Sequence, residues 1–310
     1  MASELRHRLN GLVVASNVPL PGVPRTTSSQ IDLTVTLAEG AAPPPRGVVL
    51  QGSRLFTIYD NHPEFWFVFP DGVYFRIDAC GTEVHGGWPS ALDASIAVLY
   101  LVNTVIAFVL RLRGAEVLHG CSAVIDGRAV AIVGPSGSGK STLAAALARR
   151  GFTVLAEDVT VVLEDGDGFA TAASHSRLRL WPDAAKLLYE RELPYLADRD
   201  WKTYAELDGD LDALAAQRFE LAALYSLDDR RDVPAPRVEP LSRRDALLDV
   251  LANTYHNLGE ARFATRSFER AGRLVARLPV RLAVPSRDLR TVLALADAIV
   301  DDFRALTQAA

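Results

Sequence analysis

Residues 134–141 combine glycines, a lysine and a hydroxyl group at the spacing of a phosphate-binding loop. The stretch reads GPSGSGKS and fits the pattern G-x-x-x-x-G-K-[ST] at every fixed position. Glycines let the backbone curl so that successive N–H groups point at phosphate oxygens. The amine of Lys140 then reaches the β- and γ-phosphates, and the hydroxyl of Ser141 binds Mg²⁺. We therefore predict a site for ATP with Mg²⁺. The predicted nucleotide-binding residues are Gly134, Pro135, Ser136, Gly137, Ser138, Gly139, Lys140, Ser141 and Thr142.

Two adjacent acidic residues, Glu157 and Asp158, follow the apolar run Phe152–Ala156. An acid at the carboxyl end of a strand beside the loop is where a metal-binding carboxylate of the Walker B type sits. One of the two acids could hold Mg²⁺, and the other could accept a proton from an attacking hydroxyl. The alternative is a solvated pair of acids at the end of a strand.

His119 comes just before the first predicted strand of the same region, in Leu118-His119-Gly120-Cys121. A single histidine is more often a structural hydrogen-bonding group than a catalyst, so both roles stay open. Some of the many arginines could steady phosphates or an acidic acceptor, and the alternative for each is a solvated surface side chain. The candidates are Arg177, Arg179, Arg262 and Arg266.

The elements on both sides of the loop are those that a phosphate site needs. An apolar strand at Ala129–Val133 leads into the loop, and an alanine-rich helix at Ser141–Arg150 follows it. The helix adds the partial positive charge of its N-terminus. A second apolar run, Cys121–Ile125, precedes the strand, and Asp126-Gly127 between the two predicts a tight hairpin turn. This context argues against a chance match in a glycine-rich turn.

The first part of the chain is β-rich. Apolar and polar residues alternate over 31–37, which is the period of a half-buried strand, and Pro70-Asp71-Gly72 separates two aromatic runs as a hairpin turn would. We predict a small antiparallel β-rich module at 1–87, a connecting buried helix at 88–114, and a P-loop kinase core with C-terminal helices at 115–310.

The segment Ala94–Leu110 is almost wholly apolar, so it has to be considered as a membrane span. It is shorter than the roughly 20 residues that a span needs. Asn103 and Thr104 interrupt it, and Asp93 and Arg111 flank it closely. We expect a helix buried in a soluble core and no membrane association.

Composition places the chain among ordinary globular proteins. Its net charge of −5 gives no reason to expect nucleic-acid binding. Cys80 and Cys121 fit no metal motif, and the N-terminus lacks the apolar core of a signal peptide, so we expect a reducing cytoplasm. Of the 33 basic residues only three are lysines, as in proteins from GC-rich genomes. Lys140 therefore stands out, because its motif requires an amine.

The segment from His119 to Val159, HGCSAVIDGRAVAIVGPSGSGKSTLAAALARRGFTVLAEDV, resembles the catalytic core of the HPr kinase family. That family has a His-Gly before a β-hairpin, the phosphate loop on the second strand of the hairpin, a helix, and a strand ending in paired acids. The resemblance implies an α/β fold with an HPr-kinase-like P-loop core. This core is a mixed sheet with flanking helices, related to phosphoenolpyruvate carboxykinase, to which the β-rich N-terminal module is added.

The resemblance also implies roles by position. Lys140 and Ser141 handle phosphate and metal, and Asp158 falls on the second acid, near Mg²⁺. His119 falls on the active-site histidine of the family. Glu157 falls where the family has the Asp taken as general base, and its extra methylene would move that base about 1.5 Å outward. The predicted catalytic residues are Glu157, Asp158, His119 and Lys140, and the predicted metal ligands are Ser141 and Asp158.

Three further segments look like one branch of the family, the enzymes encoded with lasso-peptide biosynthesis genes. They are GLVVASNVPLP at Gly11–Pro21, SRLRLWPDA at Ser176–Ala184 and PVRLAVPSRDLRTVL at Pro279–Leu293. In that branch the enzyme phosphorylates the precursor peptide on its C-terminal serine. The resemblance therefore implies a cytoplasmic serine kinase whose partner is a peptide or small protein. The glycine- and arginine-rich loop of the reverse phosphorylase reaction is not found, which favours a kinase alone.

Other functions fit the same residues. The acceptor could be an HPr-like protein or a small molecule. An ATPase motor or switch is disfavoured because the sequence has no obvious long switch segment or arginine-finger signal. A nucleotide-binding regulatory protein without phosphotransfer stays open, because Glu157 departs from the family pattern. A homo-oligomer also stays open, since HPr kinases form hexamers but the N-terminal module here differs.

Overall fold

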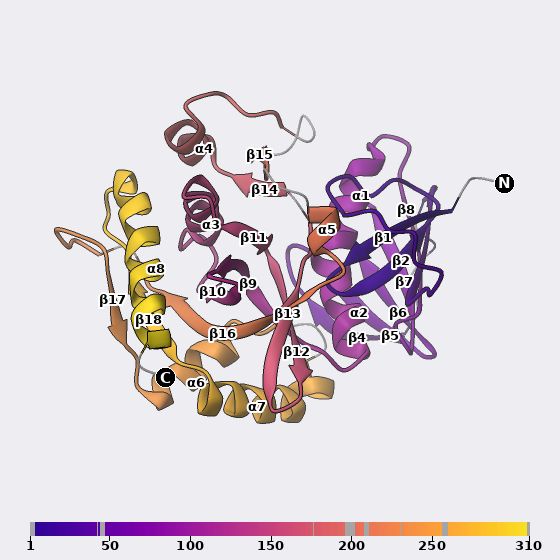
Figure 1. Ribbon diagram of the computed structural model, residues 1–310. Helices are drawn as coiled ribbons and strands as arrows, with labels where there is room; N and C mark the ends of the chain where they lie inside the picture. Colours follow the sequence, from indigo (N-terminus) through magenta and orange to yellow (C-terminus); the bar gives the residue numbers. More distant parts are fainter. Residues whose placement is uncertain are drawn as a thin grey trace.

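The computed structural model describes residues 4–41, 43, 47–175, 177–195, 202–207, 211–229, 231–255 and 260–308, without the side chains of 211 and 260–262. It is a mixed α/β structure with two eight-stranded sheets and a two-stranded sheet among these residues. Figure 1 shows the N-terminal sheet on the right and the P-loop core on the left. The proposed division at 1–87, 88–114 and 115–310, and the relation to phosphoenolpyruvate carboxykinase, stay predictions.

The N-terminal sheet has the order β1-β2-β3-β8-β7-β6-β5-β4. Its strands are β1 (Leu5–Leu9), β2 (Leu12–Ser16), β3 (Leu33–Glu39), β4 (Val48–Gly52), β5 (Thr57–Asn61), β6 (Glu64–Val68), β7 (Tyr74–Asp78) and β8 (Glu83–Trp88). The prediction of an antiparallel module is wrong, because β3 runs parallel to both of its neighbours, β2 and β8. The connection from β2 to β3 is long enough for the crossover that parallel neighbours require.

The apolar helix lies between the two halves of the molecule and has three parts. These are α1 (Ala94–Tyr100), a π-helical turn η1 (Leu101–Val105) and α2 (Ile106–Leu112). The helix begins after Pro89, since the Asp93 side chain caps it by accepting a hydrogen bond from the Ser95 amide. Phe108 of α2 makes edge contacts to Phe65 and Phe67, each at 5.1 Å between ring centroids.

By length and composition, Ala94–Leu112 is also the single candidate span among the described residues, with a mean hydropathy of 2.0. Because 67% of it is buried inside the protein, it is placed as the predicted core helix.

The sheet of the P-loop core has the order β10-β9-β12-β13-β16-β18-β17, with β11 paired to β9. The predicted hairpin is confirmed: β9 and β10 are antiparallel, and Asp126 and Gly127 in their turn both have positive φ. The second strand of the hairpin, β10, also runs parallel to β16, so the P-loop follows the carboxyl end of a central strand. The strands are β9 (Glu116–Ile125), β10 (Arg128–Val133), β11 (Thr153–Ala156), β12 (Val159–Asp165), β13 (Gly168–Ala172), β16 (Arg218–Leu227), β17 (Arg237–Pro240) and β18 (Val280–Val284).

Helices cover both faces of this sheet, as the α/β prediction requires (Figure 1). One apolar cluster joins the sheet to α3, α4 and α8, and another joins it to α6 and α7. A small hairpin of β14 (Arg177–Leu180) and β15 (Thr203–Glu206) packs beside α3 and α4. The helices are α3 (Lys140–Arg149), α4 (Pro182–Tyr189), α5 (Leu211–Leu214), α6 (Arg243–Ala252), α7 (Glu260–Arg277), the short η2 (Leu289–Thr291) and α8 (Val292–Gln308).

Candidate active site

The loop between β10 and α3 has the curled backbone that its glycines predict. Gly134 has a φ of 154°, and a Cβ there would lie 2.6 Å from the carbonyl oxygen of Leu227. Only glycine therefore fits at this position. Gly139, with a φ of 108°, caps α3 in a left-handed conformation. The N-terminus of α3 consequently points its amide groups and its partial positive charge into the loop.

Lys140 is buried inside this loop, with 7% of its surface exposed. Its Nζ donates hydrogen bonds to the carbonyl oxygens of Gly134 at 2.7 Å and Pro135 at 3.1 Å. Burial lowers the pKa of Lys140, and the nearby carboxylates Asp158 and Glu157 oppose that shift. The ammonium group thus lies where the predicted phosphates would pass.

The pairing of β11 and β12 brings His119 opposite the paired acids. Both strands pair with β9, and Glu157-Asp158 form the break between them. Val159 pairs with His119, and the Gly120 amide donates to the Asp158 carbonyl oxygen at 3.1 Å. The histidine and the acids were predicted as one site from positions far apart in the sequence, and the strand register explains why they meet.

Glu157 faces the P-loop serine. Ser141 Oγ donates to Glu157 Oε1 at 2.5 Å, and the Glu157 side chain is nearly fully buried. Burial raises the pKa of the Glu157 carboxyl, and the adjacent charge of Asp158 raises it further. This geometry differs from the predicted division, which placed Asp158 beside Ser141 on the metal.

Asp158 faces His119 instead. The distance from His119 Nδ1 to Asp158 Oδ1 is 3.2 Å, and the Tyr255 hydroxyl donates to Asp158 Oδ2 at 3.3 Å. Burial acts to raise the pKa of Asp158, but the hydrogen bond and charge of His119, with Arg179 and Lys140, hold it below its usual range. The two neighbouring carboxyls are therefore driven in opposite directions, an arrangement typical of acids with different chemical tasks.

Two residues of the site were missed from the sequence. Asn253 and Tyr255 follow α6, and Asn253 Oδ1 accepts from the Gly134 amide at 3.0 Å while its carbonyl oxygen accepts from the His119 amide at 2.7 Å. Asn253 thus ties the P-loop to the histidine strand. The only local signal was a run of polar residues, Asn253-Thr254-Tyr255, at the end of a predicted helix.

These groups line an open cavity of about 200 Å³. Beyond the predicted residues, β14–β15 adds Arg179, Trp181 and Lys202, with Lys202 Nζ lying 5.8 Å from the centre of the Trp181 ring. Trp181 is half exposed at the mouth of the cavity. The residues that line the cavity are His119, Ser136, Gly137, Gly139, Lys140, Ser141, Thr142, Glu157, Asp158, Arg179, Trp181 and Lys202.

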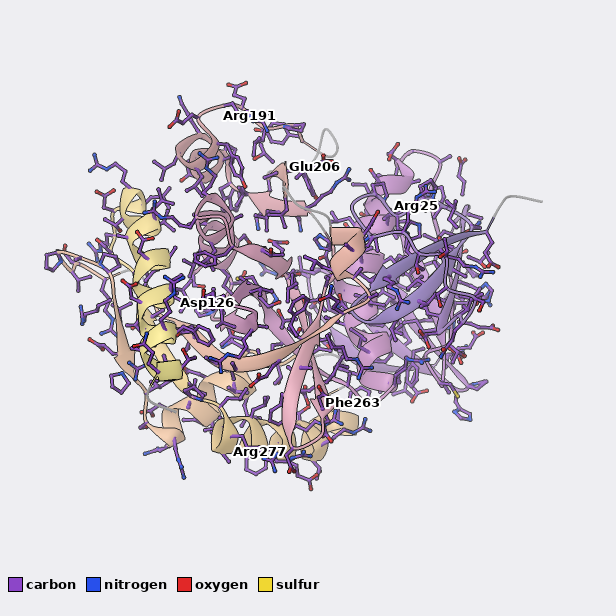
Figure 2. All side chains as sticks on the ribbon, in the orientation of Figure 1. Arg25, Asp126, Arg191, Glu206, Phe263 and Arg277 are labelled. Atoms are coloured by element: carbon purple, nitrogen blue, oxygen red, sulfur yellow. The ribbon has the colours of Figure 1, made fainter. Side chains whose placement is uncertain are left out.

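The candidate arginines separate into different places. Arg179 lines the catalytic cavity, and Arg177 donates to the exposed Glu206 at 3.2 Å (Figure 2 labels Glu206). Arg266 packs over Phe263 and donates to the Arg111 carbonyl oxygen at 3.5 Å, which is a role in the core. The side chain of Arg262 lies outside the described residues.

Cys121 lies beneath the P-loop, and its thiol donates to the Lys140 carbonyl oxygen at 3.5 Å. Burial raises the pKa of Cys121 to about 12, so the thiol stays protonated at neutral pH and is no nucleophile. Neither Cys80 nor Cys121 is in a disulfide.

The residues fit a nucleotide with a metal ion. The Ser138 hydroxyl is buried and has no hydrogen-bond partner among the described residues, as expected of a group that binds phosphate or ribose. In the same part of the chain no cluster of three His, Cys, Asp or Glu residues could hold a metal alone. The donors Ser141, Glu157 and Asp158 suit Mg²⁺, which is commonly bound by one or two carboxylates together with substrate phosphates.

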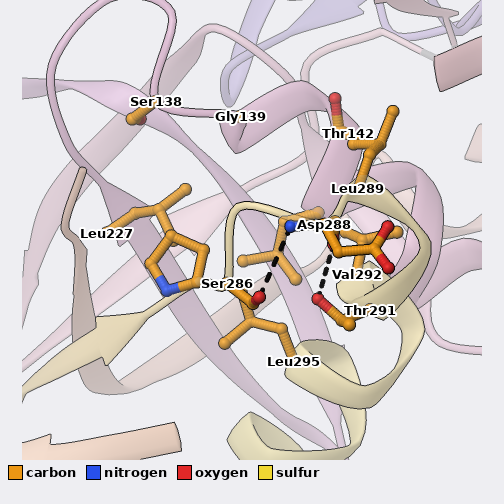
Figure 3. Close-up of a pocket in the computed structure, with 12 residues that line it drawn as sticks. Ser138, Gly139, Thr142, Leu227, Ser286, Asp288, Leu289, Thr291, Val292 and Leu295 are labelled. Carbon is orange, nitrogen blue, oxygen red and sulfur yellow. Dashed lines mark hydrogen bonds between the residues drawn. The ribbon is translucent and has the colours of Figure 1, made fainter. Parts of the chain in front are cut away.

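A second, small cavity lies on the other side of the P-loop (Figure 3). Ser138, Gly139 and Thr142 form its P-loop wall, and Leu227 and Leu295 are among its apolar residues. The segment that closes it is held by two hydrogen bonds drawn in Figure 3, from the Asp288 amide to Ser286 Oγ at 3.4 Å and from Thr291 Oγ1 to the Asp288 carbonyl oxygen at 2.7 Å.

The comparisons with known proteins agree with a P-loop nucleotide-binding domain. A family model described as an AAA domain matches residues 129–219, which include the loop and both acids. No curated protein matches the chain. Among solved structures, the Hpr(Ser) kinase/phosphatase from Coxiella burnetii matches with 16% identity and a TM-score of 0.32, covering 62% of this chain and 98% of that chain. A likeness this low adds no argument about the activity.

Proposed function

We propose that the protein is an ATP- and Mg²⁺-dependent serine kinase. The observation that carries this proposal is the separation of two adjacent carboxyls beside a P-loop, Glu157 on the Ser141 hydroxyl and Asp158 on His119. Phosphoryl transfer needs a metal-side carboxylate to neutralise phosphate charge and a separate group that receives the proton of the acceptor hydroxyl. This arrangement supplies both.

Each group then has a task. Lys140 and the loop amides hold the β- and γ-phosphates, and Glu157 with Ser141 holds the Mg²⁺ ion that offsets their charge. The contact to Asp158 requires the proton of neutral His119 on Nδ1, so that Nε2 can accept a proton. The acceptor oxygen bonds to the γ-phosphorus as the bond to the β–γ bridging oxygen breaks, ADP leaves, and the hydroxyl proton passes to His119.

This assignment revises the roles that the resemblance implied, with Glu157 on the metal and Asp158 orienting the base. The rival is the original division, with Glu157 as base and Asp158 on the metal, and it is supported by the raised pKa of Glu157. We favour the revised roles because the hydrogen bond from Ser141 already directs Glu157 to the metal position.

The nucleoside is assigned to the cavity of Figure 3, on the opposite side of the loop from the acids. The buried Ser138 hydroxyl would meet the α-phosphate or ribose there, and the apolar side chains of Leu227 and Leu295 would contact the base. Nucleoside and acceptor thus approach the phosphates from opposite ends.

For the acceptor, we propose a peptide, and specifically the C-terminal serine of a lasso-type precursor. The support is the resemblance of Gly11–Pro21, Ser176–Ala184 and Pro279–Leu293 to that branch, with Ser176 itself outside the described residues. An HPr-like protein and a small molecule remain rival acceptors. A cytoplasmic location and the absence of nucleic-acid and membrane partners stay predictions, and so does a homo-oligomer.

The test is mass spectrometry of serine peptides and of an HPr-type protein after incubation with the protein, ATP and Mg²⁺. We expect a gain of one phosphate on the serine of a peptide. Release of inorganic phosphate without a phosphorylated product would instead indicate an ATPase. Binding of ATP with neither product would indicate a regulatory nucleotide-binding protein, and would contradict the kinase.

A further inference from the structure

A cavity next to the catalytic one has no task in the reaction described so far. It has a volume of about 40 Å³ and lies between the β14–β15 hairpin and the helix α1–η1 of the N-terminal half. Arg179 lines both this cavity and the catalytic one, so the two are neighbours. We refer to it as the arginine cavity. The residues that line it are Pro21, Ser95, Val98, Leu99, Val102, Asn103, His175, Arg177, Arg179 and Tyr204.

The two walls of the arginine cavity differ in chemistry. Pro21, Val98 and Val102 give one apolar wall, while Arg177 and Arg179 lie on the other. None of the described residues that line it is acidic. Arg177 does pair with Glu206, but Nε of the same guanidinium is buried and has no hydrogen-bond partner in the described part of the chain. The cavity therefore favours a group that is negatively charged at one end.

The remaining polar groups of the cavity are neutral and fixed in place. Burial lowers the pKa of His175 to about 4, so this histidine is uncharged at neutral pH. Its Nδ1 accepts from the Arg177 amide at 3.4 Å, which leaves Nε2–H to donate to Asn103 Oδ1 at 3.4 Å. Asn103 belongs to the π-helical turn η1, an irregularity often found at functional sites. Positive charge in this cavity thus comes from the two arginines.

We propose that the arginine cavity binds a carboxylate of the phosphate acceptor, close in the acceptor to the hydroxyl that is phosphorylated. This inference rests on the proposed kinase function. A guanidinium group matches a carboxylate with two parallel hydrogen bonds, and such charge-assisted bonds are strong when they are shielded from water. The volume suits a carboxylate rather than a ring, since one water molecule takes about 30 Å³ in the liquid. Arg179 links the bound carboxylate to the site of transfer.

The carboxylate could be the free C-terminus of a peptide or an acidic side chain beside the serine. The experiment compares four synthetic peptides of one sequence with the wild-type protein. In two of them serine is the last residue, as the free acid or as the amide. In the other two the serine is internal, followed by aspartate or by asparagine. We expect kcat/KM to be at least about tenfold higher for one acidic member than for its neutral partner, mainly through KM.

Two variants locate the effect. Arg177→Gln should reduce the preference for the acidic peptide about tenfold and leave the neutral peptide and ATP binding unchanged, and Arg177→Lys should restore part of the preference. The matched control is Arg191→Gln, an exposed arginine that lines neither cavity. Equal rates for acidic and neutral peptides, or a preference that Arg177→Gln leaves intact, would overturn the inference while the kinase stands. Transfer to none of the four peptides would contradict the peptide-kinase proposal and this inference together.

Discussion

The catalytic cavity and the arginine cavity share Arg179 but handle charge in opposite ways. In the first, ionisable groups are buried together and paired closely: Lys140 with the loop carbonyls, Glu157 with Ser141, and Asp158 with His119. In the second, the buried histidine is neutral and the opposite wall is apolar. The difference indicates chemistry in one cavity and recognition in the other, so changes in the first should reduce turnover and changes in the second should alter selectivity.

The largest effect is expected for the lysine of the P-loop. Lys140→Ala removes the ammonium that offsets charge on the transferring phosphate, so phosphate transfer should fall about 10³-fold or more. Initial rates of transfer with saturating peptide measure this loss. The control is Lys186→Ala on the exposed surface of α4, which should have the activity of the wild-type protein. Comparable activity of the two variants would exclude Lys140 from the reaction.

The next effect concerns the pair of Asp158 and His119. Asp158→Asn and His119→Gln should each lower kcat by about 10²-fold or more, because both interrupt the path of the acceptor proton. The double variant should be little worse than either single variant, as for residues that act as a unit. Nucleotide affinity measured in parallel should be retained. Additive losses in the double variant would show that the two residues act separately.

A pH effect on stability separates the two cavities further. The pKa of His175 is about 4 in the folded protein and about 6.5 when unfolded, so the unfolded state binds more protons between these values. The free energy of unfolding should therefore fall by about 3 kcal/mol as the pH drops from 6.5 to 4. Denaturant titrations of the wild-type protein and of His175→Asn measure the difference. Parallel pH profiles for the two proteins would show that His175 is not buried in its neutral form.

The smallest effect is expected at Glu157. Glu157→Gln keeps the shape of the side chain but removes the carboxylate, so the Mg²⁺ concentration for half-maximal activity should rise about tenfold. Burial raises the pKa of Glu157, and protonation weakens a metal ligand, so the Mg²⁺ requirement of the wild-type protein should increase as pH falls through that raised pKa. The variant should lack this pH dependence. A loss of kcat at saturating Mg²⁺ would instead restore Glu157 as the base.

The features predicted correctly from the sequence are local. The P-loop, the hairpin before it and the helix after it depend on residues within about one turn or strand of each other, such as Asp126-Gly127 and Lys140-Ser141. The buried helix was also predicted, since its composition allowed few alternatives, although its π-helical turn was not.

The features that were missed depend on register and on distant contacts. Which acid faces Ser141 depends on how β11 and β12 meet β9, and no spacing in the sequence encodes that choice. Asn253 and Tyr255 reach the site from more than 90 residues away, through the packing of α6. The parallel pairing of β3 was missed for the same reason, because alternation predicts a strand but not its neighbours.

Calorimetric titration of the protein with ATP, with and without Mg²⁺, tests the central claim most directly. The account predicts saturable binding of ATP that strengthens when Mg²⁺ is present and is lost in Lys140→Ala. Binding that is absent, or that is the same with and without Mg²⁺ in both proteins, would contradict a triphosphate site at this loop.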